Sequence, residues 1–205
     1  MSTKPTSTTE ELTQCLETPF LGNAIEICIV TPNLKSTLEG LVRLGIGPFK
    51  IFKFTPETVT NQMIHGKPAS FSIDVAFAEQ KNMVWEVMQP ISGPTLMQKY
   101  LEDTNGKGGI QHVSFDCKKA ERGEGKGDLV GEAARLEAKR RKDEFEKRGF
   151  PLAQSGVWHG KRGTCEFMFF DTVGAVNTCF ESYVFSDDWE DPHDVEWFPE
   201  RPEEI

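Results

Sequence analysis

The stretch Met63-Ile-His-Gly-Lys-Pro-Ala-Ser-Phe71 is matched in outline by Val157-Trp-His-Gly-Lys-Arg-Gly-Thr-Cys165. Each copy leads into an apolar segment typical of a β-strand, FSIDVAFA in the first and CEFMFFD in the second. A further apolar segment then carries a single acid, Glu86 in the first copy and Glu181 in the second. The histidine of each turn precedes that acid by 21 and 22 residues, respectively. Such a repeat indicates an internal duplication.

Each copy also begins in the same way. The segments Ala24–Val30 and Ile110–Asp116 are predicted strands, and a helix is expected after each. The first helix is predicted to run from an N-cap at Asn33 to a glycine stop at Gly45, and the second from about 128 to 148. The order strand, helix, turn, strand, acid-bearing strand therefore occurs twice, which predicts two β-α-β modules fused into one domain.

Four ionisable residues occupy equivalent strand positions in the two copies. Side chains alternate between the faces of a strand, so Glu26 faces away from the isoleucines beside it, and His112 takes the matching position in the second module. A carboxylate within an apolar strand is costly unless it is exposed, paired or bound to a metal. One such residue alone is usually exposed or structural, but Glu26, Glu86, His112 and Glu181 together predict a shared interior site. Three carboxylates and one imidazole suit Mn, Mg, Zn, Co or Ni.

Most of the net charge of −9 comes from the end of the chain, where residues 186–205 hold nine acids against Arg201. We expect an acidic, solvated tail, while its tryptophans leave docking onto the body as the alternative. The rest of the chain is nearly neutral, which predicts neither a nucleic-acid groove nor a membrane-binding surface.

The cysteines predict a reducing environment. Five are present, an odd number, and they form neither a CxxC pair nor a disulfide framework. No apolar run approaches the roughly 20 residues needed to span a bilayer. These features predict a soluble, cytoplasmic protein.

The ordered motifs resemble those of the vicinal oxygen chelate superfamily, which includes glyoxalase I, methylmalonyl-CoA epimerase, extradiol dioxygenases and bleomycin-resistance proteins. The resemblance covers about residues 20–185. The segments that carry it are 24–34, 44–49, 65–68, 84–90, 109–115, 170–172 and 177–181.

The resemblance implies an α+β fold, in which two paired βαβββ modules form a U-shaped mixed sheet around a central cavity. Together with the composition, it divides the chain into a flexible N-terminal tail, a single domain and the acidic tail. The expected parts are 1–19 for the N-terminal tail, 20–91 for module one, 92–106 for a linker helix, 107–185 for module two and 186–205 for the acidic tail. Within module two, charged residues and glycines predict an inserted surface loop at 118–128.

The resemblance also implies that Glu26, Glu86, His112 and Glu181 bind a divalent metal ion, because the family takes its ligands from the first and last strand of each module. Glu26 departs from the family pattern, in which this position is commonly His or Gln. A single histidine does not suit an iron dioxygenase, which needs two.

The implied activity is that of a metal-dependent isomerase, epimerase or lyase. It would abstract a proton α to a carbonyl through a metal-stabilised enediolate, with Glu181 as the general base. Glu57 and Glu166 are candidates for a second base. The substrate would be a small oxygenated metabolite or an acyl thioester, and a homodimer is left open.

Two alternatives remain at this stage: a lactoylglutathione lyase of the glyoxalase I type, and a metal-free small-molecule binding protein on the same fold. The turn residues His65 and His159 are interpreted as hairpin residues at the cavity rim, with substrate contact as the alternative.

Overall fold

The computed structural model describes residues 7–117, 131–193 and 195–202. The strands are β1 (Ala24–Val30), β2 (Phe49–Phe54), β3 (Val59–Ile64), β4 (Lys67–Pro68), β5 (Ser72–Glu79), β6 (Val84–Ser92), β7 (Gly109–Phe115), β8 (Leu152–His159), β9 (Thr164–Phe170), β10 (Cys179–Phe185) and β11 (Glu196–Phe198). The helices are α1 (Thr9–Glu17), α2 (Leu34–Arg43), α3 (Leu96–Asp103), α4 (Gly131–Lys147) and α5 (Val173–Val176).

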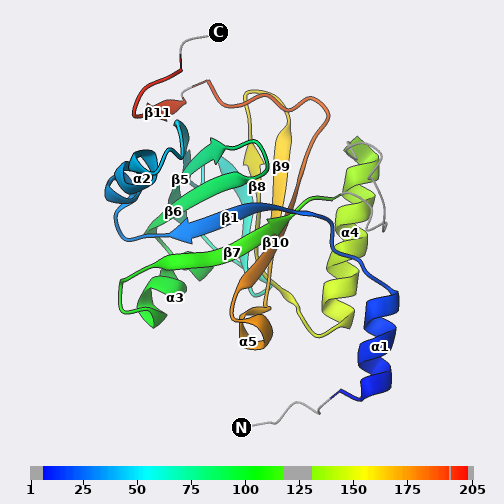
Figure 1. Cartoon of the computed structure of the whole chain (residues 1–205). Coiled ribbons are helices and arrows are strands. Elements are labelled where there is room, and N and C mark those ends of the chain that lie inside the picture. Colours follow the sequence, from blue (N-terminus) through cyan, green and yellow to red (C-terminus); the bar gives the residue numbers. More distant parts are fainter. Residues whose placement is uncertain (1–6, 118–130, 194, 203–205) are drawn as a thin grey trace.

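All these strands join one curled mixed sheet in the order β11-β2-β5-β6-β1-β7-β10-β9-β8-β3-β4. The helices lie on the outside of the sheet (Figure 1). This arrangement confirms the predicted α+β class with a U-shaped mixed sheet.

The duplication is visible in the strand pairing. In each half the first strand pairs in parallel with the last, β1 with β6 and β7 with β10. The intervening strands add antiparallel neighbours outward, β5 and β2 in one half and β9 and β8 in the other. The two halves meet at the antiparallel pair β1 and β7, which places the acid-bearing strands on either side of the centre.

Helix α2 forms where the sequence predicts it. The side chain of Asn33 accepts a hydrogen bond from the backbone N–H of Ser36 at 3.0 Å, which caps the helix. Leu34, Leu38 and Leu41 are buried against the sheet. Cap and apolar face together fix both the start of the helix and its orientation.

The two His-Gly-Lys turns are not structurally equivalent. The second joins β8 to β9, but the first joins β3 to β4, a hairpin without a counterpart in the described part of the second half. Strand β3 pairs with β8, and the backbone N–H of His65 donates to the carbonyl of Ala153 at 2.7 Å. Module one therefore extends the sheet of module two, and the duplication rests on the strand order rather than on this tripeptide.

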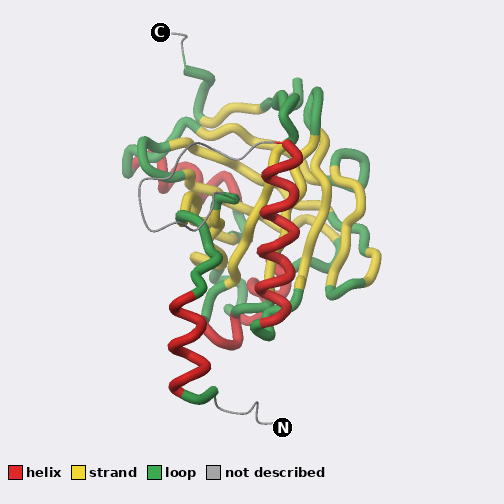
Figure 2. Tube along the Cα trace, turned by 90° about the vertical axis from the view of Figure 1, so that its right-hand side faces the viewer, coloured by secondary structure: helices red, strands yellow, loops and turns green. Residues whose placement is uncertain are grey.

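The N-terminal segment contains a helix, α1, where a flexible tail was expected over residues 1–19. Thr8 and Glu11 form a capping box, which satisfies two backbone N–H groups at the start of the helix. Arg148 holds its end by donating to the carbonyl of Thr18 at 2.8 Å. Figure 2 shows the helix projecting beside the longer α4. Residues 1–6 and the predicted loop at 118–128 lie outside the described residues.

Residues 186–193 and 195–198 dock on the body, which is the alternative to a solvated tail. After β10 the chain reaches the edge of the sheet formed by module one, where β11 pairs with β2 (Figure 1). The ring of Trp189 packs on that of Trp158 with centroids 4.7 Å apart. We call this segment, residues 186–193 and 195–198, the C-terminal strap. Across the described parts of the chain, no helix is long and apolar enough to cross a membrane.

Candidate metal centre

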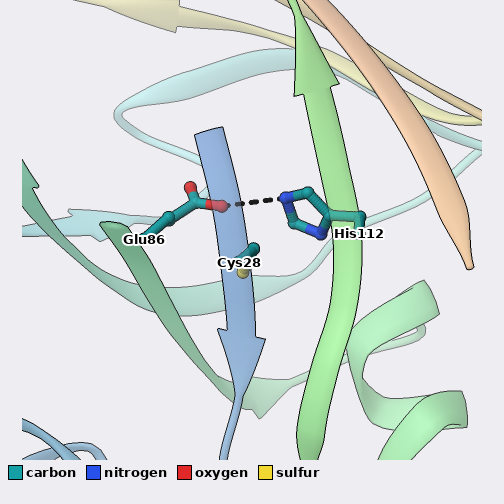
Figure 3. Close-up of side chains that lie close together, drawn as sticks. All are labelled: Cys28, Glu86 and His112. Carbon is teal, nitrogen blue, oxygen red and sulfur yellow. Dashed lines mark hydrogen bonds and ion pairs between the residues drawn. The ribbon is translucent and has the colours of Figure 1, made fainter. Parts of the chain in front are cut away.

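The four central strands bring the predicted site residues together in two adjacent rows. In the first row, Cys28 on β1 lies beside Glu86 on β6 and beside His112 on β7. Figure 3 shows Glu86 and His112 pointing toward one another across β1, with Cys28 between their strands. The distance from His112 Nε2 to Glu86 Oε2 is 2.9 Å.

The second row lies two residues further along the same face. Glu26 on β1 is the neighbour of Ser114 on β7, and Ser114 is the neighbour of Glu181 on β10. Ser114 Oγ lies 2.8 Å from Glu26 Oε1 and also contacts Glu181 Oε2. Each row therefore has a small side chain between two larger ionisable ones.

The rows converge on one cluster. Glu26, Glu86, His112 and Glu181 each offer a ligand atom, and these atoms all lie within 4.8 Å of one another. All four side chains are buried, with residue exposures between 0 and 4%. We call these residues the four-residue cluster; the structure brings together every residue that the sequence nominated as a ligand.

Burial governs the charge state of the carboxyl groups. Burial, followed by the nearby Glu86 and Glu181, raises the pKa of Glu26 well above its ordinary value. Burial also raises the pKa of Glu86, although its hydrogen bond with His112 partly offsets this effect. Without a cation, burial therefore favours retention of protons on Glu26 and Glu86.

His112 is held as an imidazolium ion by its neighbours. Burial alone would lower its pKa, but hydrogen bonds and charge interactions with Glu181 and Glu86 outweigh burial and raise the pKa to about 10. The other ring nitrogen, Nδ1, lies 2.6 Å from Gln111 Oε1, an acceptor that fixes the proton on Nδ1. Nε2 is thus aimed at the carboxylates, the orientation that a metal-binding histidine requires.

The contacts of Ser114 also indicate that the cluster holds an additional proton. A hydroxyl group has one proton, so Ser114 can donate to Glu26 or to Glu181 but not to both. The remaining contact needs a proton on the carboxyl group, which agrees with the raised pKa of Glu26. A bound cation could replace that proton.

The donor set fits a divalent metal ion. Carboxylate oxygens and imidazole nitrogen are suitable ligands for Mn, Mg, Zn, Co or Ni, and their mutual distances allow them to surround one ion. Cys28 Sγ also lies within 4.8 Å of ligand atoms of Glu86 and His112. Burial raises the pKa of the Cys28 thiol well above its usual range, so the thiol is neutral in the metal-free protein.

The cluster lies beside a cavity of about 400 Å³, which is lined by Glu26, Glu86 and Glu181. Eight aromatic residues also line this cavity, among them Phe52, Phe77 and Trp158. The site therefore combines a carboxylate-rich end with apolar walls, the arrangement expected of a small-molecule pocket.

Other residues proposed from the sequence lie elsewhere. Glu57 and Glu166 are exposed and do not line the cavity, which excludes them as the second base in this conformation. Glu166 alternates with the inward-facing Cys165 and Phe167 on β9, so strand parity turns it outward. His65 and His159 are exposed turn residues that do not line the cavity either.

Strand parity places Cys28 on the same face as Glu26 and Ser114 on the same face as His112, but no sequence motif gives either residue a role. Their small size was the signal, because each lies between two converging ionisable side chains in its row. Gln111 gave no such signal, since its contact with His112 depends on side-chain conformation.

Two paired modules surround a cavity, and the first and last strands of the modules together carry four candidate ligands, which defines a duplicated fold with a candidate metal site. The model of the Glyoxalase/Bleomycin resistance protein/Dioxygenase superfamily matches residues 26–169. The chain belongs to this superfamily, which confirms the predicted relationship. A search of curated proteins finds no match.

Solved structures share the fold at low sequence identity. A hypothetical protein from Bacillus halodurans is 15% identical with a TM-score of 0.51, covering 82% of this chain and 98% of that one. Methylmalonyl-CoA epimerase from Mycobacterium tuberculosis is 14% identical with a TM-score of 0.47, covering 82% and 90%. A Streptomyces coelicolor methylmalonyl-CoA epimerase variant in complex with 2-nitronate-propionyl-CoA is 14% identical with a TM-score of 0.48, covering 84% and 99%. The likeness to the Bacillus halodurans structure concerns the fold alone and leaves the reaction to be inferred from the site.

Proposed function

We propose that this protein is a divalent-metal-dependent isomerase, epimerase or lyase that moves a proton α to a carbonyl group. The observation that carries the proposal is the four-residue cluster, in which three carboxyl groups and one imidazole converge at a cavity. Three buried carboxyl groups are costly to keep together. A site that maintains them is suited to holding a cation.

Glu181 is the proposed general base. Its side chain lines the cavity, so a substrate in the cavity can reach it. Ser114 and His112 contact the same oxygen, Oε2, which holds the carboxyl group in one orientation. A carboxylate held in this way can accept a proton from an acidic C–H group placed against it.

The other cluster residues bind and orient. Glu26, Glu86, His112 and Glu181 would hold the metal ion, whose positive charge would stabilise the negative charge that develops on the substrate oxygen. The aromatic walls keep water away from the reacting carbon, which strengthens every electrostatic interaction at this end of the cavity.

Two measurements test the proposal. Protein purified without chelator should contain a divalent metal ion, and it should catalyse exchange of a substrate α-proton with deuterated water, observed by NMR. Glu181→Gln should slow the exchange by about 10²- to 10⁴-fold. Glu166→Gln is the matched control, because this exposed glutamate on the neighbouring strand lies outside the cavity and should leave the rate unchanged.

The proposal fails on either of two results. Less than about 0.2 equivalents of any divalent metal, with no binding of added Mn or Zn, would exclude the metal centre. Metal-loaded protein that exchanges no α-proton across a panel of α-hydroxy ketones and ketoaldehydes would exclude proton abstraction.

A further inference from the structure

Gln154, on β8, has a buried hydrogen-bond donor without a partner. Its Oε1 accepts from the backbone N–H of Leu96 at 2.8 Å, and this contact fixes which end of the amide is oxygen. Its Nε2 has no hydrogen-bond partner among the described residues, although the residue is only 1% exposed. Gln154 also lines the cavity. A buried amide donor left unmet is costly, so a ligand oxygen in the cavity would satisfy it.

Gln154 lies in the same row as the proposed base. Glu181 on β10 is the neighbour of Phe169 on β9, and Phe169 is the neighbour of Gln154 on β8. Adjacent strands are about 4.8 Å apart, so the backbones of Glu181 and Gln154 are separated by about 10 Å. An aromatic side chain lies between the two polar positions, which suits a ligand that is polar at both ends and has a ring in the middle.

The described residues that line the cavity offer no unpaired positive charge to bind an anionic ligand. Among the described residues that line the cavity, Lys50 is the one cation, and it forms an ion pair with Asp191 of the C-terminal strap at 2.7 Å. Lys161 and Arg162, on the β8–β9 turn outside the cavity lining, both pair with Glu190 of the strap, at 3.2 and 2.5 Å. The strap thus pairs with the lining cation and with two further cations on this turn.

We propose that Gln154 positions the far end of an uncharged aromatic substrate, which presents an α-hydroxycarbonyl group to the four-residue cluster and an acceptor oxygen to Gln154 Nε2. This inference rests on the proposed function for the reacting end of the substrate. It excludes polyanionic acyl thioesters, for which the described lining offers no unpaired cation.

Binding of two uncharged ligands tests the role of Gln154. We would measure the dissociation constants of α-hydroxyacetophenone and its para-methoxy derivative by calorimetry, using metal-loaded protein. The methoxy oxygen provides the acceptor, so this compound should bind about three- to tenfold more tightly. Gln154→Met should abolish the preference while still binding the parent compound.

Gln89→Met is the matched control. Gln89 also accepts from a backbone N–H at the start of a helix, that of Leu34 at 2.7 Å, but it does not line the cavity. Gln89→Met loses an equivalent hydrogen bond to the start of a helix and should keep the preference for the methoxy compound. Equal affinity of the two ligands for the natural protein overturns the proposal, whether or not Gln154→Met folds. Persistence of the preference in Gln154→Met also overturns it.

A second pair of variants tests whether the pairing of Lys50 with Asp191 makes the cavity unfavourable for anionic ligands. Asp191→Asn releases Lys50 and should tighten the binding of benzoylformate, an aromatic anion, by about two- to fivefold. Asp188→Asn removes an exposed strap acid that does not line the cavity and should have no effect. If acetyl-CoA binds the natural protein as tightly as the methoxy compound does, the proposal that the substrate is uncharged is refuted.

The two proposals fail separately. If the methoxy preference depends on Gln154 but no ligand exchanges its α-proton, the proposed function is wrong and the assignment of Gln154 stands. If exchange occurs without any methoxy preference, the assignment of Gln154 is wrong and the proposed function stands.

Discussion

Divalent cations should bind the four-residue cluster more tightly as the pH rises. In the metal-free protein, the pKa of His112 is raised to about 10 by the hydrogen bonds and charges of Glu181 and Glu86, which outweigh the opposite effect of burial. The imidazole must lose its Nε2 proton before that nitrogen can bind an ion. At pH 7 the neutral form is about one part in a thousand, so the apparent affinity lies about a thousandfold below its limit.

The expected slope follows from the protons released. Loss of the His112 proton alone makes the association constant rise about tenfold per pH unit up to a pH of about 10. Burial raises the pKa of Glu26 as well, so displacement of its proton adds to the slope wherever this group remains protonated. The logarithm of the association constant should therefore rise by one to two per pH unit.

Competition with a fluorescent chelator measures this slope, with Mn or Co at several pH values between 6.5 and 8.5 and a correction for protonation of the chelator. His112→Gln should reduce the slope by about one, because it removes one titrating ligand. His159→Gln is the control, since this exposed turn histidine lies outside the cluster. A flat profile for the natural protein would refute the imidazolium state and the charge balance derived from it.

Three further outcomes test stability. Asn33→Ala should lower the free energy of unfolding by about 1 kcal/mol in urea denaturation, because the cap on Ser36 N–H is lost; no change would contradict the capping role. Arg141→Met should lower the free energy of unfolding by about 1–3 kcal/mol, since the buried backbone carbonyl of Asp116 loses a hydrogen-bond donor while Glu137 keeps Arg140, and a neutral result would show that packing alone suffices. The metal-free protein should lose thermal stability as pH rises from about 6.5 to 10, because folded His112 retains its proton longer than the unfolded chain does; saturating metal should reverse the loss, and a pH-independent melting temperature would count against it.

Local signals account for the parts of the fold that were predicted. The period-two pattern of β1 and the Asn33 cap of α2 act within a few residues, so the sequence contains everything that determines them. The features that were not predicted depend on contacts between segments far apart in the sequence. Pairing of β3 with β8 and of β11 with β2 joins distant segments, and no local pattern distinguishes a docked strap from a solvated acidic tail.

The same distinction between local patterns and long-range contacts applies to the candidate site. Parity and the repeat were enough to nominate Glu26, Glu86, His112 and Glu181, because the duplication places matching strands at the centre of one sheet. The free donor of Gln154 could not be predicted. It depends on a contact with Leu96, 58 positions away, that occupies one end of the amide and leaves the other toward the cavity.

The charges at the two ends of the cavity, including the third carboxyl group of Glu26, together determine which class of substrate the cavity favours. When a divalent ion displaces the protons of the cluster, its charge of +2 and the three carboxylates leave the reacting end with a net charge of −1, and Asp191 offsets the charge of Lys50, the one lining cation among the described residues. An anionic substrate would meet repulsion at the cluster and no attraction at the rim, whereas a divalent cation is drawn to the cluster. The same charges that favour the metal ion therefore favour a neutral substrate, oriented by the aromatic walls and by the Gln154 amide rather than by an ion pair.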